Sequence, residues 1–266
     1  MNKIKWLATD HPLAFAMIAT LVFILMVIVS SVLGAAWPGE PYGQYIGGVI
    51  GRGISSAILL VALSRLGWLR PAGFTRPGRS PAWLISLLLL AYWIPVSAYA
   101  VTRNFDFGIS DPELLGLLTL FFLAHGFLEE VAFRGLILYA FVRVWGSTAP
   151  GMIKSVLVSA LFFGGMHGIY ILSGTPLTAL PLQMVETFFL GIFLGVLVLR
   201  GSSIYPAVFF HGIVNLAGFL NLLANSFDGI PPSAWLLLSL LMLPLAIFGI
   251  YLLRDVPHRP VVPEAA

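Results

Sequence analysis

Polar side chains that could carry out chemistry interrupt long apolar stretches of this sequence. They are His125, Glu129, Glu130, Arg134, His167, His211 and Asn215. An ionisable group at membrane depth costs about 2.5–3.5 kcal/mol to insert. A functional role is therefore the first hypothesis for such a group, ahead of a purely structural one. A buried glutamate can act as a general base, and histidine and asparagine can donate hydrogen bonds to an oxyanion. These residue types together permit the hydrolysis of a peptide bond.

Spacing along helices predicts which of these side chains meet, because residues four apart lie on the same helical face. Three pairs have this spacing: His125 with Glu129, Glu130 with Arg134, and His211 with Asn215. The second pair predicts an ion pair, with the glutamate in the favoured N-terminal position. The third pair can present two polar groups to one cavity.

The depth of these groups is a second indication of a common site. A helix rises about 1.5 Å per residue, so depth can be counted from the basic residue that ends each apolar stretch. Glu129, His167 and His211 then lie about 21, 20 and 16 Å from that residue. Three separate helices bring polar groups to a similar level, which predicts that they converge.

The composition requires lipid as the solvent for most of the surface. Of the 266 residues, 59% are hydrophobic and 9% are charged, whereas a soluble domain carries about 25% charged residues. This excludes a soluble globular enzyme, a nucleic-acid-binding domain and a disordered protein. The lack of cysteine excludes disulfides and thiolate metal sites.

Apolar stretches of about 20 residues, the length that crosses a bilayer as a helix, recur along the whole chain. They lie at roughly 12–35, 44–66, 82–102, 112–145, 152–171, 178–199, 203–224 and 234–253. The sequence therefore predicts an all-α, polytopic integral membrane protein with about eight transmembrane helices in a single domain, 1–266. The stretch 112–145 is long enough to be tilted, kinked or divided. The first stretch is too long for a cleaved signal and is expected to be retained.

The basic residues predict the orientation of these helices. With the N-terminus in the cytoplasm, eleven of the 14 fall on the cytoplasmic side: Lys3, Lys5, Arg65, Arg70, Arg76, Arg79, Arg143, Lys154, Arg200, Arg254 and Arg259. Arg103 falls outside, and Arg52 and Arg134 lie within helices. This bias follows the positive-inside rule, so both termini are predicted to be cytoplasmic. In a prokaryote the membrane would be the plasma membrane.

Three short motifs resemble those of a known family. Glu129–Gly135 (EEVAFRG) matches the EExxxR motif of the CPBP intramembrane proteases, which include CAAX proteases and bacteriocin-processing enzymes and are also called the ABI family. Phe163–His167 matches the family's FxxxH motif, and His211–Asn215 matches HxxxN. The resemblance, also to type II CAAX prenyl endopeptidases, covers about 112–223, the expected protease core.

The resemblance implies an intramembrane endopeptidase that cleaves a membrane-associated protein or peptide, by CAAX-type or related processing. It assigns water activation to Glu129 and His167, and oxyanion stabilisation to His211 and Asn215. Glu130 and Arg134 would then be a supporting pair.

Metal dependence stays open on the sequence. Zinc bound by Glu129, His167 and His211 is one alternative, because two histidines and a glutamate form known catalytic zinc sites. A mechanism without a required metal is favoured, because the HExxH helix is absent and Asn215 is a poor zinc ligand.

Two other functions remain as alternatives: a non-catalytic membrane immunity or regulatory scaffold, and a proton-coupled transporter. The lack of an internal repeat counts against the transporter. The expected partners are the lipid bilayer and the substrate, and not nucleic acid. The substrate, its prenylation and the oligomeric state are left open.

Several smaller predictions concern individual residues. Arg52 is expected to pair with a carboxylate, Glu130 or Glu186, or to lie by a substrate path. His125 is expected to line the cavity or contact a helix, with orientation of Glu129 as the second choice. Glu186 is expected to be solvated or to link helices. Small residues are expected to leave room for water at Gly164, Gly165 and Gly168, and to pack helices closely at Gly191 and Gly195.

Overall fold

The computed structural model describes residues 3–39, 42–102, 111–224 and 232–256, and within these ranges it contains helices and no strands. The helices are α1 (Lys3–Asp10), α2 (Pro12–Ala35), α3 (Gly43–Arg65), α4 (Ser80–Thr102), α5 (Pro112–Glu130), η1 (Val131–Leu138), α6 (Tyr139–Trp145), α7 (Ala149–Met166), η2 (His167–Ser173), α8 (Leu180–Gly201), α9 (Tyr205–Ala224), α10 (Pro232–Leu252) and η3 (Leu253–Asp255). Two of the residues used to predict orientation, Arg103 and Arg259, lie outside the described residues.

All eight predicted apolar stretches form helices. Six helical segments of the described chain are long and apolar enough to cross a membrane: α2, α3, α5 to α6, α7 to η2, α8 and α10. Shorter apolar segments of α4 and α9, Ser80–Pro95 and Tyr205–Leu220, make up the rest. The chain is therefore an integral, multi-pass membrane protein, as its composition predicted.

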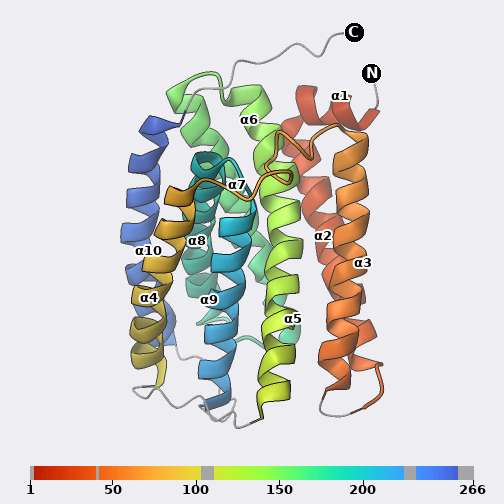
Figure 1. Cartoon of the computed structure of the whole chain (residues 1–266), viewed down its shortest axis with the longest axis vertical. Coiled ribbons are helices and arrows are strands. Elements are labelled where there is room, and N and C mark those ends of the chain that lie inside the picture. The colour runs from red at the N-terminus through yellow and green to blue at the C-terminus, as the bar shows by residue number, and fades with distance from the viewer. Residues whose placement is uncertain (1–2, 40–41, 103–110, 225–231, 257–266) are drawn as a thin grey trace.

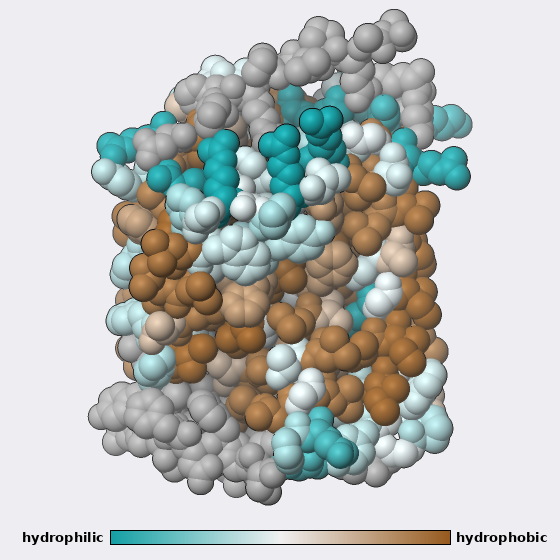
Figure 2. Space-filling model, viewed as in Figure 1, coloured by the Kyte–Doolittle hydropathy of each residue, from teal (hydrophilic) through white to brown (hydrophobic). Residues whose placement is uncertain are grey.

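The helices run side by side along the long axis of the molecule, with α5 and α9 packed together at its centre (Figure 1). α1 and the end of α10 lie at the same end of the bundle, as an even number of crossings requires (Figure 1). Figure 2 shows hydrophobic side chains around the middle of the visible face and hydrophilic ones gathered at the end where α1 lies. Which end faces the cytoplasm stays a prediction from the basic residues.

The long fourth stretch is divided by a π-helix. α5, η1 and α6 follow one another without a break over Pro112–Trp145, and η1 begins directly after Glu130. A π-helical turn holds more residues than an α-helical turn, so side chains after it point in new directions, and such turns are frequent at functional sites. A donor from α7 stabilises η1, because the hydroxyl of Ser159 donates to the carbonyl oxygen of Phe133 over 3.2 Å.

Glycines let α7 and α8 approach each other closely. A Cβ on Gly191 would lie 3.1 Å from Ala160 of α7, which confirms the predicted packing role there, whereas one on Gly195 would make only an ordinary contact, 3.6 Å from Val156 of α7. The predicted water space at Gly164 is wrong: a Cβ there would lie 2.7 Å from the carbonyl oxygen of Met184 on α8. The space that the missing side chain of Gly164 leaves is therefore filled by the backbone of α8 and not by solvent.

The segment between α3 and α4, residues 66–79, crosses the bundle and is bound to the α8–α9 junction. The carbonyl oxygen of Gly73 accepts from the amide of Ile204 (3.2 Å), and the hydroxyl of Ser203 donates to the carbonyl oxygen of Arg76 (2.7 Å). The phenol of Tyr205 donates to the carbonyl oxygen of Phe74 over 2.9 Å. These bonds fix the segment as a cover over one end of the bundle (Figure 1).

A polar contact ties α3 to α5 just outside the membrane-spanning segments. Asp111 caps α5, because its carboxylate accepts from the amides of Glu113 (2.9 Å) and Leu114 (3.2 Å). The phenol of Tyr42, at the start of α3, donates to the second carboxylate oxygen of Asp111. This hydrogen bond and those from the backbone hold the pKa of Asp111 below its ordinary value.

The lowered pKa predicts a specific acid sensitivity. A depressed carboxyl pKa gives stability that is complete above the ordinary value, near 4, and is lost as the pH falls through the folded-state pKa. Acidification is therefore expected to lower the thermal unfolding temperature of the wild type more than that of Tyr42→Phe. Thermal denaturation in detergent at several pH values measures this. Equal acid sensitivity of the two proteins would contradict it.

Candidate functional site

Glu129 lies at the centre of the cluster that the sequence predicted. Its side chain is buried, and histidines approach both carboxylate oxygens. The Nε2 atom of His125 lies 3.3 Å from Oε1, and the Nε2 atom of His211 lies 3.1 Å from Oε2. Within the described part of the chain, Oε2 has no aligned hydrogen-bond donor. This carboxylate therefore keeps a lone pair available, although it is 1% exposed.

Glu130 and Arg134 form the predicted ion pair, with Nη1 2.9 Å from Oε1. The same Oε1 lies 2.9 Å from Nδ1 of His211. Arg134 also donates from Nη2 to the carbonyl oxygen of Gly191 over 3.2 Å. Because all these groups are buried, the pair joins α5, η1, α8 and α9 around one point.

His211 links the two glutamates. Its two ring nitrogens face one carboxylate each: Nδ1 forms a hydrogen bond with Glu130, whereas Nε2 lies 3.1 Å from Oε2 of Glu129 without the alignment of a hydrogen bond. The predicted convergence of α5 and α9 is therefore confirmed. Asn215 lies one turn further along α9 and is half-buried, and its place at the same cavity as His211 stays a prediction.

Phe163 connects His167 to this cluster. The guanidinium of Arg134 lies over its ring, 4.3 Å from the centroid, and the rings of His167 and His211 meet it edge-on at 5.0 and 5.6 Å. The FxxxH motif thus places an aromatic platform beside the ion pair. The Nδ1 atom of His167 lies 2.8 Å from the carbonyl oxygen of Phe163, which can only accept, so Nδ1 carries the hydrogen. The remaining nitrogen, Nε2, is left as a proton acceptor.

Three of the smaller sequence predictions need correction or extension. Arg52 does not pair with Glu130 or Glu186: its Nε donates to Nδ1 of His125 over 3.0 Å. His125 lines a cavity, as predicted, and also contacts Glu129. Glu186 is 5% exposed, so the solvated position was wrong, and its role in linking helices stays a prediction.

Close contact between two glycines brings α5 and α9 together beside the site. A Cβ on Gly126 would lie 3.1 Å from the backbone nitrogen of Gly212, and one on Gly212 would lie 3.0 Å from the Cα atom of Leu123. Small residues allow such close approach of membrane helices. The sequence analysis did not identify this contact, although Gly126 directly follows His125 and Gly212 directly follows His211.

Gly212→Ala is expected to lower activity, since the added methyl group would push α9 from α5 and separate His211 from both glutamates. A displacement of about 1 Å can reduce a rate about 100-fold. The initial rate of peptide cleavage in proteoliposomes measures the effect.

Gly218→Ala is the matched control, because the same helix has open space at that position. Equal rates for both variants would contradict the close-packing argument.

A small cavity lies beside the carboxylate of Glu129. It is lined by Phe23, Ile24, Val27, His125, Glu129, Met166, Ile169 and Tyr170. Its volume of about 20 Å³ is enough for about one water molecule. Apart from His125, Glu129 and the tyrosine, its walls are apolar, and α2 supplies three of them. The cavity wall is therefore apolar except at these three side chains.

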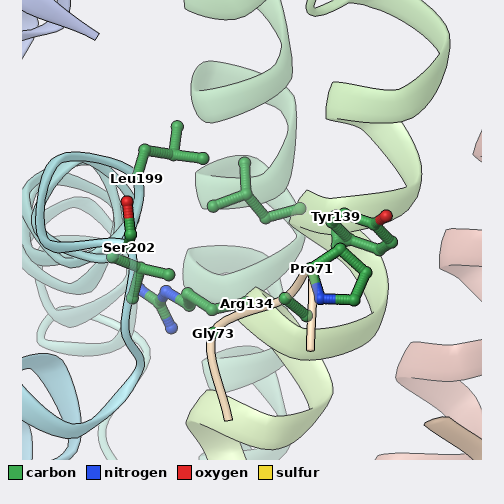
Figure 3. A pocket seen from close by; sticks show the side chains of 9 residues that line it. Pro71, Gly73, Arg134, Tyr139, Leu199 and Ser202 are labelled. Carbon is green, nitrogen blue, oxygen red and sulfur yellow. The ribbon is translucent and has the colours of Figure 1, made fainter. Parts of the chain in front are cut away.

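A second cavity reaches the ion pair from the end covered by residues 66–79. It has a volume of about 20 Å³, and Figure 3 shows Arg134 and Tyr139 on one ribbon with Pro71, Gly73, Leu199 and Ser202 around them. A larger hollow of about 280 Å³, lined by Arg70, Pro71, Arg76 and Ser202, shares two of these residues. Arg134 thus lies close to the hollow that Arg70 and Arg76 line.

The zinc alternative requires Glu129, His167 and His211 to point at one position. Both nitrogens of His211 instead face carboxylates, and Nδ1 of His167 faces a backbone carbonyl. Among the described residues, no three histidine, aspartate or glutamate side chains are placed to hold a metal ion. Metal dependence therefore stays a prediction, with the mechanism without a required metal favoured as before.

One comparison with known proteins returns a match. The family model described as type II CAAX prenyl endopeptidase Rce1-like matches residues 111–217, from the cap of α5 to two residues beyond Asn215. No curated protein and no solved structure matches the chain. The matched segment contains all three motifs, and α1 to α4 and α10 lie outside it.

Proposed function

We propose that this chain is a glutamate-dependent intramembrane endopeptidase, and the match of residues 111–217 to the type II CAAX prenyl endopeptidase Rce1-like family model supports this. It would hydrolyse a peptide bond of a membrane-associated protein or peptide, in CAAX-type or related processing. Glu129 and His167 would activate the water, and His211 and Asn215 would stabilise the oxyanion.

The observation that carries this proposal is the environment of Glu129. One carboxylate oxygen contacts His125, and the other lacks an aligned donor within the described residues. Both Glu129 and His125 line a cavity with room for about one water molecule. A buried base beside a water-sized space is what general-base hydrolysis needs.

The proposed chemical step uses these residues in the following way. The water oxygen bonds to the carbonyl carbon of the substrate while a water proton passes to Glu129, and Nε2 of His167 holds the water in line. The carbonyl oxygen becomes an oxyanion, to which His211 and Asn215 donate. The tetrahedral intermediate then collapses, the carbon–nitrogen bond breaks, and the leaving amine takes the proton from Glu129.

Glu130 and Arg134 support this site without contacting the substrate in the proposal. Their ion pair, together with the Phe163 ring, fixes His211 relative to Glu129. Preorganised donors of this kind lower the barrier because they need not reorient during the reaction.

Activity is expected to persist without metal. Nδ1 of His211 faces Glu130 and Nδ1 of His167 faces a backbone carbonyl, which supports a mechanism without metal, so a preparation depleted of metal by a chelator should cleave at the rate of the untreated protein. The initial cleavage rate in proteoliposomes before and after depletion measures this. A loss of activity that added zinc restores would overturn the metal-free mechanism.

Comparative proteomics of membranes tests the function itself. Cells producing the wild type should contain cleaved peptide termini that are missing with Glu129→Ala at equal abundance. Glu113→Ala is the matched control, because this glutamate lies on α5 but is exposed in its first turn. If Glu129→Ala and His211→Ala both preserve the cellular function, the protein acts as a scaffold and not as a protease.

A further inference from the structure

We propose that Arg52 and His125 are positioning residues that hold the carboxylate of Glu129 in its reactive orientation. The inference rests on the proposed function and extends the site beyond the matched segment. Arg52 lies on α3, which is outside residues 111–217. The three side chains form a continuous chain from α3 to the centre of the site.

The first link fixes the tautomer of His125. The Nε atom of Arg52 can only donate, and it lies 3.0 Å from Nδ1 of His125, which must therefore accept. In a neutral ring the hydrogen is then on Nε2. That nitrogen faces Oε1 of Glu129 at 3.3 Å. Catalytic hydrogen bonds are often long in the free enzyme and shorten when substrate binds.

The second link fixes Arg52 itself. Its Nη1 donates to the carbonyl oxygen of Gly48 over 3.2 Å, and its guanidinium lies 4.2 Å from the centroid of the Phe121 ring. A Cβ on Gly48 would lie 2.5 Å from that ring and 3.0 Å from Nη1. The missing side chain of Gly48 therefore gives room for both groups. Arg52 is 6% exposed, so water does not compete for these contacts.

The contacts from Arg52 through His125 to Glu129 also explain which oxygen of Glu129 reacts. With Oε1 facing His125, the carboxylate cannot rotate freely about its last bond. Oε2, which has no aligned donor in the described chain, is then left to take the proton of the water. Loss of either positioning residue should allow the carboxylate to turn, so that fewer enzyme molecules have a reactive base.

Kinetics of four variants test the proposal, with an internally quenched prenylated CAAX peptide as the probe in proteoliposomes. His125→Ala and Arg52→Met are expected to lower kcat roughly 10- to 100-fold with KM unchanged, as misplacement of a catalytic group does. His125→Gln keeps an N–H donor at the same reach and should recover most of the rate. Arg52→Met in a His125→Gln background should add little, because no ring tautomer remains to be fixed.

Ser55→Ala is the matched control on α3. Ser55 is buried and lies 3.3 Å from Ser30 of α2 by its hydroxyl, but it has no part in the chain to Glu129. This variant should keep the kcat of the wild type. If its kcat falls as much as that of Arg52→Met, the effect comes from a general disturbance of α3 packing and the proposal is overturned.

A spectroscopic measurement needs no substrate. In protein labelled with ¹⁵N-histidine, the His125 resonances, assigned by their loss in His125→Gln, should show the form protonated at Nε2. Arg52→Met should convert this to a mixture of forms. An unchanged tautomer would overturn the positioning role.

Failure of this inference can be distinguished from failure of the proposed function. Unchanged kcat in His125→Ala, with cleavage abolished in Glu129→Gln, would overturn only the positioning role. Cleavage that persists in Glu129→Gln would overturn the function, whatever the tautomer of His125.

Discussion

Glu129→Gln is expected to reduce the cleavage rate by roughly 10²–10⁴-fold, the range that a general base contributes. Glutamine has nearly the same shape as glutamate, so the packing around the site should persist. Its amide cannot take a proton from water, and its NH₂ group would face a histidine N–H that now meets a carboxylate oxygen. The measurement is kcat in proteoliposomes at equal enzyme concentration.

The control for this prediction lies on the same helix. Glu113→Gln removes an exposed carboxylate from the first turn of α5 and should leave kcat unchanged. If Glu129→Gln cleaves as fast as Glu113→Gln, water activation does not depend on Glu129. The proposed mechanism would then be wrong, while the match of residues 111–217 to the family model would still stand.

Arg134→Met is expected to cause the largest loss of stability. It would leave the buried carboxylate of Glu130 without its arginine, and removal of one partner of a buried ion pair costs about 3–5 kcal/mol. The carbonyl oxygen of Gly191 and the ring of Phe163 would also lose their contacts with the guanidinium. Thermal unfolding in detergent should occur at a clearly lower temperature than in the wild type.

The double variant Glu130→Gln with Arg134→Met separates charge from packing. Replacing both members of a buried pair leaves no uncompensated charge, so it should unfold at a higher temperature than Arg134→Met alone. If the double variant is less stable than the single one, the arginine stabilises by packing rather than by neutralising Glu130.

The local patterns of the sequence predicted much of the site. Spacing of four residues gave the Glu130–Arg134 ion pair and the contact between His125 and Glu129. These succeeded because neighbours on one helix are separated by fixed helical geometry, whatever the rest of the chain does. The depth count correctly predicted that α5 and α9 meet at His211. It succeeded because the depth of a residue in each helix is counted, at about 1.5 Å per residue, from the same membrane boundary.

Contacts between distant helices were predicted less well. A carboxylate partner was expected for Arg52, but a histidine 73 residues away accepts from it. A charge count names possible partners, whereas the rotation of each helix about its axis decides which of them is reached. The same reason explains Glu186. Its place near the outer interface predicted a solvated or helix-linking side chain, and helix packing leaves it 5% exposed.

The sequence by itself determined the solvent, the helices and the residue types of the site, because hydropathy and short motifs are local properties. Only the tertiary structure decided that a π-helix follows Glu130, that Gly126 meets Gly212, and that Arg52 reaches Glu129 through His125. Each of these depends on how closely two helices approach and how they are rotated. Those quantities are set by the packing of all side chains together, and no single stretch of the chain encodes them.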